Sequence, residues 1–312
     1  METIPKPEHG SLDWLRLRHR MKDGRVRFGA SEAPILMGVS KYETLTSLAI
    51  RKWAEPEVTE PNEAMNRGNL LEPALITYAQ QVLQQDVFTP VEMFAEGRMI
   101  ATLDGLSDDG IWIVEAKTTT AYSSDDELPA DYFWQVIAQF ACWPSAERAL
   151  VVVLDKRLRL GSWIINRSSH YEDIERLLAR AEEIGSYFDR LELPPEANPS
   201  EHEVKRLYPE PEGHVELDTA TIAAIEMWQV WKDAREEAEH NEQEARDKIA
   251  RMLGSHEVGT LNGQSVVTFK YRKGSVRLDT KRLEADYPDL VARYKQESQP
   301  TRVLRLTTGG NK

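Results

Sequence analysis

The sequence predicts a mixed α/β fold in which a central sheet is flanked by helices, followed by a smaller C-terminal domain with a long helix and a β-hairpin. Apolar residues recur at helical spacing in the first third, and short apolar runs between turn residues in the middle indicate strands. The proline-rich residues 193–200 are typical of a domain edge. We therefore expect a first domain over residues 1–195, a linker over 196–217 and a second domain over 218–312.

The composition indicates a globular protein and excludes several classes. Of the 312 residues, 41% are hydrophobic and 29% are charged, which is enough apolar material for a core. Cys142 is the only cysteine, so an intramolecular disulfide and a metal centre built from several cysteines are excluded. The chain has no run of about 20 apolar residues and begins with polar residues, so we expect no membrane segment or signal peptide and a cytoplasmic location.

The first third is expected to be mostly helical. Apolar positions between residues 12 and 17 indicate one helix, and Ser31 is placed to cap a short helix over residues 32–36. Leucines and other apolar residues at helical spacing predict a longer helix over residues 70–83. Glu72 would then lie near its start, where the helix dipole favours a carboxylate.

The middle of the chain changes to a strand pattern. Residues 99–103 and 111–117 are predicted to form an antiparallel hairpin, because the residues between them, 105–110, are rich in turn formers. The following elements are expected to be a helix, two strands and another helix, over residues 132–143, 149–154, 160–166 and 171–191.

The second domain should begin with a long helix that Asp218 caps and Gly254 ends. Asn262-Gly263 then predicts a hairpin between residues 258–261 and 265–271. Residues 262–312 carry eleven Lys or Arg against five Asp or Glu, although the whole chain has a net charge of −13. This basic segment is either a groove for DNA or a solvated face of a small domain.

The most informative residues are Asp104 and the run Glu115-Ala116-Lys117. Because side chains alternate along a strand, Glu115 and Lys117 should share one face, and Asp104 at the end of the neighbouring strand can converge on them. Carboxylate oxygens suit Mg²⁺ or Mn²⁺, which activates water for phosphodiester hydrolysis, and a lysine can position that water. The alternative is a surface hairpin with a cross-strand salt bridge.

Five fragments follow one another in a recognisable order: Arg25-Val26-Arg27-Phe28-Gly29-Ala30-Ser31-Glu32-Ala33, Gly68-Asn69-Leu70-Leu71-Glu72, Leu103-Asp104-Gly105, Glu115-Ala116-Lys117 and Tyr132-Phe133-Trp134-Gln135. In these fragments the chain resembles the YqaJ-like viral recombinase and phage lambda exonuclease family of the PD-(D/E)XK nuclease superfamily. The resemblance covers roughly residues 12–195.

The resemblance implies a restriction-endonuclease-like core and a role for each site residue. Asp104, Glu115 and the backbone carbonyl of Ala116 would hold the metal. Lys117 would serve the attacking water. Glu72 would add a third carboxylate, and Gln135 would support the site from its helix.

A second site is implied at Ser31. A hydroxyl at a helix N-terminus can bind an anion, and either Arg25 or Arg27 could add a charge-assisted contact. By resemblance, this serine and arginine would hold the 5′-phosphate of the strand being degraded. The alternative is a simple helix cap with solvated arginines.

The activity implied is that of a Mg²⁺-dependent 5′→3′ exonuclease of phage-type recombination, acting on double-stranded DNA ends in a bacterial host. The resemblance also implies 3′ single-stranded overhangs for a single-strand annealing protein and a ring-shaped homotrimer. Two alternatives stay open: an endonuclease whose C-terminal domain recognises its target, and a DNA-binding protein that retains the fold without catalysis.

Overall fold

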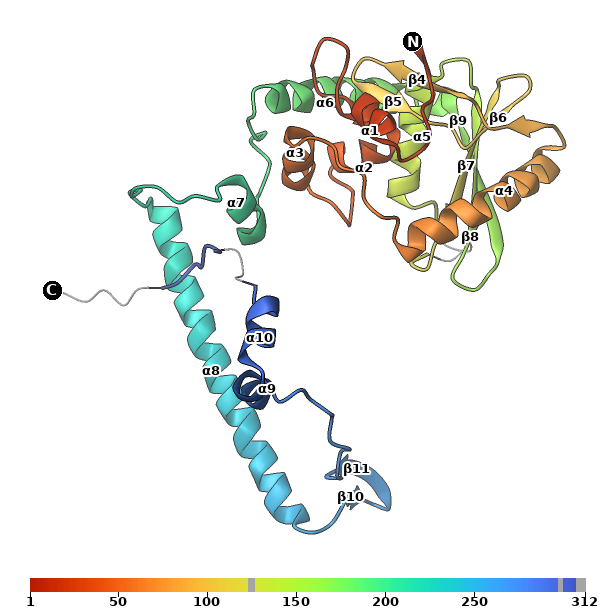
Figure 1. The fold of residues 1–312 in the computed structure, drawn as a ribbon. Coiled ribbons are helices and arrows are strands. Elements are labelled where there is room, and N and C mark those ends of the chain that lie inside the picture. The colour runs from red at the N-terminus through yellow and green to blue at the C-terminus, as the bar shows by residue number, and fades with distance from the viewer. Residues whose placement is uncertain (123–126, 297–299, 307–312) are drawn as a thin grey trace. The chain divides into compact units, whose positions relative to one another are not determined.

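The computed structural model describes residues 1–122, 127–296 and 300–306, and the chain divides into two compact units (Figure 1). The first unit covers Met1–Leu207 and the second covers Tyr208–Lys312. A short helix, α7 (Glu201–Leu207), lies inside the predicted linker range but belongs to the first unit, where Glu203 contacts Thr44.

A five-stranded mixed sheet forms the centre of the first unit, in the order β3-β6-β7-β8-β9. Only β7 and β8 run parallel, and the other neighbours pair antiparallel. Helices cover both faces of this sheet, so the expected mixed α/β fold is confirmed (Figure 1). The strands are Val87–Phe88, Gly105–Ser107, Trp112–Thr118, Arg148–Leu154 and Leu160–Asn166, respectively.

Strand alternation decides which helix each face meets. Val114, Leu150 and Val152 pack against helix α4 (Glu63–Leu83), whereas Ile113 and Val151 pack in the cluster that contains helix α5 (Ala130–Cys142). Glu115 is two residues after Ile113, so its side chain points to the α5 side of the sheet. The alternation therefore brings a buried carboxylate against a helix.

A second sheet has four strands in the order β1-β4-β5-β2. Its strands β4 and β5 contact α5 as well, so this helix lies against both sheets. In chain order the four strands are β1 (Glu2–Pro5), β2 (Phe28–Gly29), β4 (Glu92–Glu96) and β5 (Met99–Ala101).

The predicted hairpin of residues 99–103 and 111–117 is wrong. Strand β5 belongs to the four-stranded sheet, and β7 pairs instead with β6, which occupies residues that were expected to form a turn. A close approach explains the glycine in this strand, because a Cβ on Gly105 would lie 2.6 Å from Val87 Cγ1. The true turn comes later, where Gly110 has a φ of +72°.

Helix α4 begins earlier than predicted. Asn62 caps it by accepting a hydrogen bond from the Met65 N–H, so Glu72 lies in the middle of the helix and not in its first turn. The first turns are mostly exposed and carry no apolar stripe, which is why helical periodicity did not reveal them. The helix dipole therefore does not explain why a carboxylate occupies position 72.

The remaining helices of the first unit surround the core. Ser31 was predicted to cap the short helix that follows, and this prediction is wrong. The residue lies within the 3-10 turn η1 (Ala30–Glu32). The predicted helices near residues 132–143 and 171–191 and the strands near 149–154 and 160–166 are confirmed. The other helices are α1 (Leu12–His19), α2 (Ala33–Leu36), α3 (Leu45–Trp53) and α6 (Tyr171–Asp189), with the short 3-10 turn η2 (Arg167–Ser169) before α6.

The second unit begins with the long helix α8 (Thr219–Leu253), which Asp218 caps and Gly254 ends, as expected. Asn262 and Gly263 both have positive φ angles and join strands β10 (Val258–Leu261) and β11 (Gln264–Thr268) in the predicted hairpin. Helices α9 (Thr280–Asp286) and α10 (Pro288–Tyr294) follow. Across the described parts of both units, no helix is long and apolar enough to span a membrane.

Candidate active site

Strand β7 carries a carboxylate and an ammonium on one face. Glu115 and Lys117 are two residues apart, and Lys117 Nζ lies 2.6 Å from Glu115 Oε1. Only 1% of the Glu115 surface is exposed, whereas the Lys117 side chain is 24% exposed, so the carboxylate is buried and the ammonium is half-buried. A carboxylate is buried at such a position only where other groups satisfy its oxygens.

Two glutamines of α5 supply those contacts. Gln135 Nε2 donates to Glu115 Oε1 at 2.6 Å, and Gln135 Oε1 accepts from Lys117 Nζ at 3.0 Å. One turn later, Gln139 Nε2 donates to Glu115 Oε2. Gln139 is not among the predicted site residues, although two glutamines four residues apart on an otherwise apolar helix face are a signal for it.

Asp104 lies between β5 and β6, where the chain passes from one sheet to the other. Its Oδ2 accepts a hydrogen bond from the Ala116 N–H at 3.0 Å. The N–H and C=O of one residue in a strand point to the same edge, so the Ala116 carbonyl also faces the Asp104 side. Strand β6 pairs with β7 only as far as Val114, which leaves this edge free at Ala116.

The carboxylates at this edge influence each other. Burial raises the pKa of Asp104 well above its usual value, and the charges of Glu115 and Glu72 raise it further against the opposing effect of Lys117. Burial and the charge of Glu115 also raise the pKa of Glu72, which is half-buried. Burial disfavours the charged form of Lys117, but Glu115 and Asp104 outweigh it and raise the pKa of the ammonium. Three carboxylates thus share the one ammonium of Lys117, and an added cation would favour the ionised forms of Asp104 and Glu72.

The donor set fits a hard divalent cation. Asp104, Glu115 and the Ala116 carbonyl supply oxygen ligands at one edge, and Mg²⁺ is usually held by one or two carboxylates while it keeps several waters. Three His, Cys, Asp or Glu side chains do not gather at one point anywhere in residues 1–122, 127–296 and 300–306. Asp104 and Glu115, with the Ala116 carbonyl, would be the ligands of such an ion.

A second group of residues lies around Ser31. Arg18 on α1 donates from its guanidinium to Ser31 Oγ at 2.7 Å, and the same guanidinium lies 4.2 Å from the centre of the Trp14 ring. Within the described ranges, Arg18 forms no ion pair with a carboxylate. Its positive charge is therefore available to an anion.

The two arginines expected at Ser31 lie elsewhere. Arg25 pairs with Asp23 at 2.8 Å, and the buried Arg27 pairs with Glu2 at 3.2 Å. Arg18 occupies the position that the sequence analysis had assigned to one of them. Trp14 and Arg18 are four residues apart on one helix, which was the signal available for this pair.

One cleft, with a volume of about 510 Å³, connects the two groups. Its lining includes Arg18, Ser31, Asn69, Glu72, Asp104 and Gln135. The Arg18 guanidinium at Ser31 and the carboxylates of Asp104 and Glu72 therefore face the same space. Such a cleft can hold an anionic chain end at one point and a reacting phosphate at another.

This mixed α/β unit, with its carboxylates and lysine at one strand edge, is similar to a YqaJ-like viral recombinase domain. The model of that domain matches residues 13–146, which include every candidate site residue, and the expected resemblance to this family is confirmed. The "Uncharacterized protein YqaJ" of Bacillus subtilis (strain 168) is 25% identical over an aligned length of 318 residues, and the alignment covers 95% of this chain and 95% of that protein.

Two solved structures are also similar. An alkaline exonuclease from Laribacter hongkongensis has a TM-score of 0.46 and 19% identity over 58% of this chain and 96% of its own. A phage related exonuclease from Haemophilus somnus 129PT has a TM-score of 0.44 and 14% identity over 54% of this chain and 95% of its own.

Proposed function

We propose that this protein is a metal-dependent exonuclease that degrades double-stranded DNA in the 5′→3′ direction. The observation that carries the proposal is the single cleft that joins Asp104 and Gln135 to the Arg18–Ser31 pair. The match of residues 13–146 to the model of a YqaJ-like viral recombinase domain supports a role in phage-type recombination.

The chemistry follows from the contacts of each residue. A Mg²⁺ ion, or Mn²⁺ as a substitute, would polarise the scissile phosphate and lower the pKa of a water at this site. Asp104, Glu115 and the Ala116 carbonyl would hold that ion, with Glu72 acting through water. Lys117 remains charged beside Glu115 and would orient the attacking water or stabilise negative charge on the phosphate.

Gln135 and Gln139 hold the Glu115 carboxylate in one orientation, because they donate to its two oxygens from adjacent turns of α5. Gln135 also contacts Lys117, so it links the carboxylate and the ammonium. These two glutamines therefore act as positioning residues.

Arg18 and Ser31 would bind the 5′-terminal phosphate of the strand that is degraded. A phosphate monoester carries a charge of about −1.5 to −2 and matches an unpaired guanidinium. With the end held there, the first phosphodiester bond can reach the carboxylates in the same cleft, and digestion proceeds from the 5′ end. The product would be a duplex with a 3′ single-stranded overhang.

The proposal extends to assembly and partners on the strength of the family resemblance. It includes a homotrimeric ring and delivery of the overhang to a single-strand annealing protein. The second unit would serve assembly, DNA contact or partner binding. Its exposed basic side chains suit DNA phosphates: Lys270, Arg272, Lys273, Arg277, Lys281 and Arg282.

Digestion of linear and covalently closed circular duplex DNA with Mg²⁺ tests the proposal. Linear DNA should be degraded while circles stay intact, and Lys117→Met should lose at least about 100-fold in rate because a group that stabilises developing charge is removed. Lys156→Met is the matched control, since Lys156 is exposed in the turn between β8 and β9. Cut circles would favour the endonuclease, and DNA binding without any loss of either substrate would favour the non-catalytic protein.

A further inference from the structure

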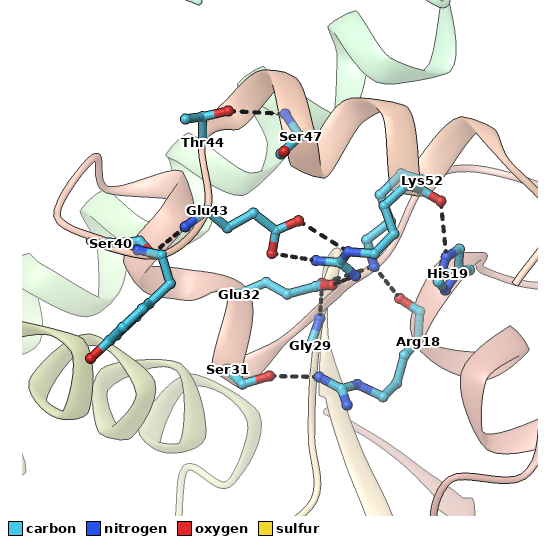
Figure 2. Close-up of polar contacts among 12 residues, drawn as sticks. Arg18, His19, Gly29, Ser31, Glu32, Ser40, Glu43, Thr44, Ser47 and Lys52 are labelled. Atoms are coloured by element: carbon cyan, nitrogen blue, oxygen red, sulfur yellow. Dashed lines mark hydrogen bonds and ion pairs between the residues drawn. The ribbon is translucent and has the colours of Figure 1, made fainter. Parts of the chain in front are cut away.

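A buried ion pair lies next to the Arg18–Ser31 contact (Figure 2). Lys52 on α3 is fully buried, and its Nζ lies 2.8 Å from Oε2 of Glu32, which is also buried. Taking two charges out of water often costs as much as their attraction returns, so a buried pair is no general source of stability. The place of this pair next to the cleft indicates a more specific role.

Both partners also contact the backbone at or near Arg18 and Ser31. Lys52 Nζ donates to the Arg18 carbonyl at 2.7 Å, and this carbonyl lies in the last turn of α1, where carbonyls lack partners within the helix. Glu32 Oε2 accepts from the Gly29 N–H at 2.7 Å. The ion pair therefore ties the end of α1 to the turn that carries Ser31.

Gly29 gives the guanidinium its space. A Cβ at this position would lie 2.2 Å from Arg18 Nη2, so the guanidinium lies directly against the Gly29 backbone. Its backbone angles, φ −72° and ψ 153°, are ones that any residue adopts. Glycine is therefore needed here because it leaves space for the Arg18 side chain, and not because of its backbone conformation.

The charged residues around Glu32 form a cluster in which one cation has no carboxylate partner among the described residues. Its members are Arg18, Glu32, Glu43, Arg51 and Lys52. Glu32 also pairs with Arg51 at 2.6 Å, and Arg51 pairs in turn with Glu43 at 2.9 Å. Three cations therefore face two carboxylates, and the cation without a carboxylate partner among the described residues is Arg18. The cluster neutralises its own interior and presents one positive charge to the cleft.

We infer that the Glu32–Lys52 ion pair and Gly29 together fix the Arg18 guanidinium at Ser31, and that this fixed position sets a preference for 5′-phosphorylated DNA ends. Glu32, Lys52 and Gly29 are positioning residues, because they act through Arg18. The inference rests on the proposed function, since it concerns how that cleft selects its substrate.

Binding without cleavage tests the inference. Fluorescence anisotropy in EDTA would compare one duplex with a 5′-phosphate and the same duplex with a 5′-hydroxyl. The wild type should prefer the phosphate by about tenfold or more, the usual effect of a charge-assisted hydrogen bond. Gly29→Ala should lose this preference and keep its fold, because the added methyl group displaces only the flexible end of Arg18.

The double variant Glu32→Gln/Lys52→Met should also lose the preference, since it removes both charges without leaving either one buried alone. Arg98→Met is the matched control, because the buried Arg98 side chain forms ion pairs with Glu182 and Asp189, and its contacts do not include Arg18 or Ser31. It should lower the melting temperature and keep the preference.

Two outcomes would overturn the inference. One is that the folded Gly29→Ala and double variants bind with the wild-type preference. The other is that the wild type itself does not distinguish the two duplexes. In the second case, digestion of linear duplex by the wild type with Mg²⁺, measured in parallel, would show whether the proposed exonuclease function still holds.

Discussion

Replacing Gln139 by leucine should weaken catalysis without unfolding the protein. Gln139 is fully buried on α5 and donates to Glu115 Oε2, so leucine, which is similar in size, leaves that oxygen without this donor. A hydrogen bond to a charged group contributes about 1.5–3 kcal/mol, which corresponds to about a tenfold to hundredfold loss in the rate or in the affinity for Mg²⁺. Partners of metal-binding carboxylates show losses of the same order.

The assay is the initial rate of linear duplex digestion across a series of Mg²⁺ concentrations, with circular dichroism and melting temperature as checks on folding. Gln80→Leu is the matched control, because Gln80 also donates one hydrogen bond, at 3.0 Å to the Val87 carbonyl, but on α4 and away from Glu115. If folded Gln139→Leu showed the wild-type rate and the wild-type Mg²⁺ dependence, Gln139 would not position Glu115 for catalysis.

Three further predictions concern stability. Gly105→Ala should destabilise the first unit by about 1–3 kcal/mol, because its Cβ would lie 2.6 Å from Val87 Cγ1. Gly68→Ala in α4, whose Cβ would have its nearest contact at 3.9 Å, should be neutral or stabilising. Urea unfolding measures the free energy of unfolding of both variants. Burial opposes ionisation of Glu32, but Lys52 and Arg51 hold its pKa at about 2. The ionised Glu32 therefore contributes about 3 kcal/mol to the free energy of unfolding above pH 4.5, and this contribution is lost as the pH falls toward 2. The difference in unfolding free energy between wild type and Glu32→Gln should therefore narrow across that range, and an unchanged difference would contradict this. Excess Mg²⁺ should stabilise the wild type and raise its melting temperature; at a hundred times the dissociation constant the gain in unfolding free energy is about 2.7 kcal/mol. Asp104→Asn should abolish this rise in melting temperature, whereas Asp108→Asn, at an exposed position, should keep it.

Local pattern was enough to predict the part of the site that lies on one strand. The alternation of Glu115 and Lys117 follows from strand geometry alone, and the structure brings the two side chains together. Asp104 also lies beside β7, but for a reason that the sequence did not reveal. It accepts from the Ala116 N–H where β6 stops, and the hairpin that was expected to bring it there does not exist.

Long-range contacts account for what could not be predicted. The Arg18–Ser31 contact depends on the absence of a side chain at Gly29 and on a buried lysine from α3, and neither leaves a periodic signal. Arg25 and Arg27 were closer to Ser31 in sequence, but carboxylates elsewhere in the first unit engage them. The start of α4 was missed because its exposed turns have no apolar stripe.

The account is tested most directly by following the two ends of one linear duplex. The duplex carries a 5′-phosphate and a label on either the 5′-terminal or the 3′-terminal nucleotide of the same strand, and it is incubated with the full chain and Mg²⁺. The account predicts that the 5′ label is released first as a mononucleotide, and that Lys117→Met releases neither label at a comparable rate. Release of the 3′ label first, or equal release by wild type and Lys117→Met, would contradict it.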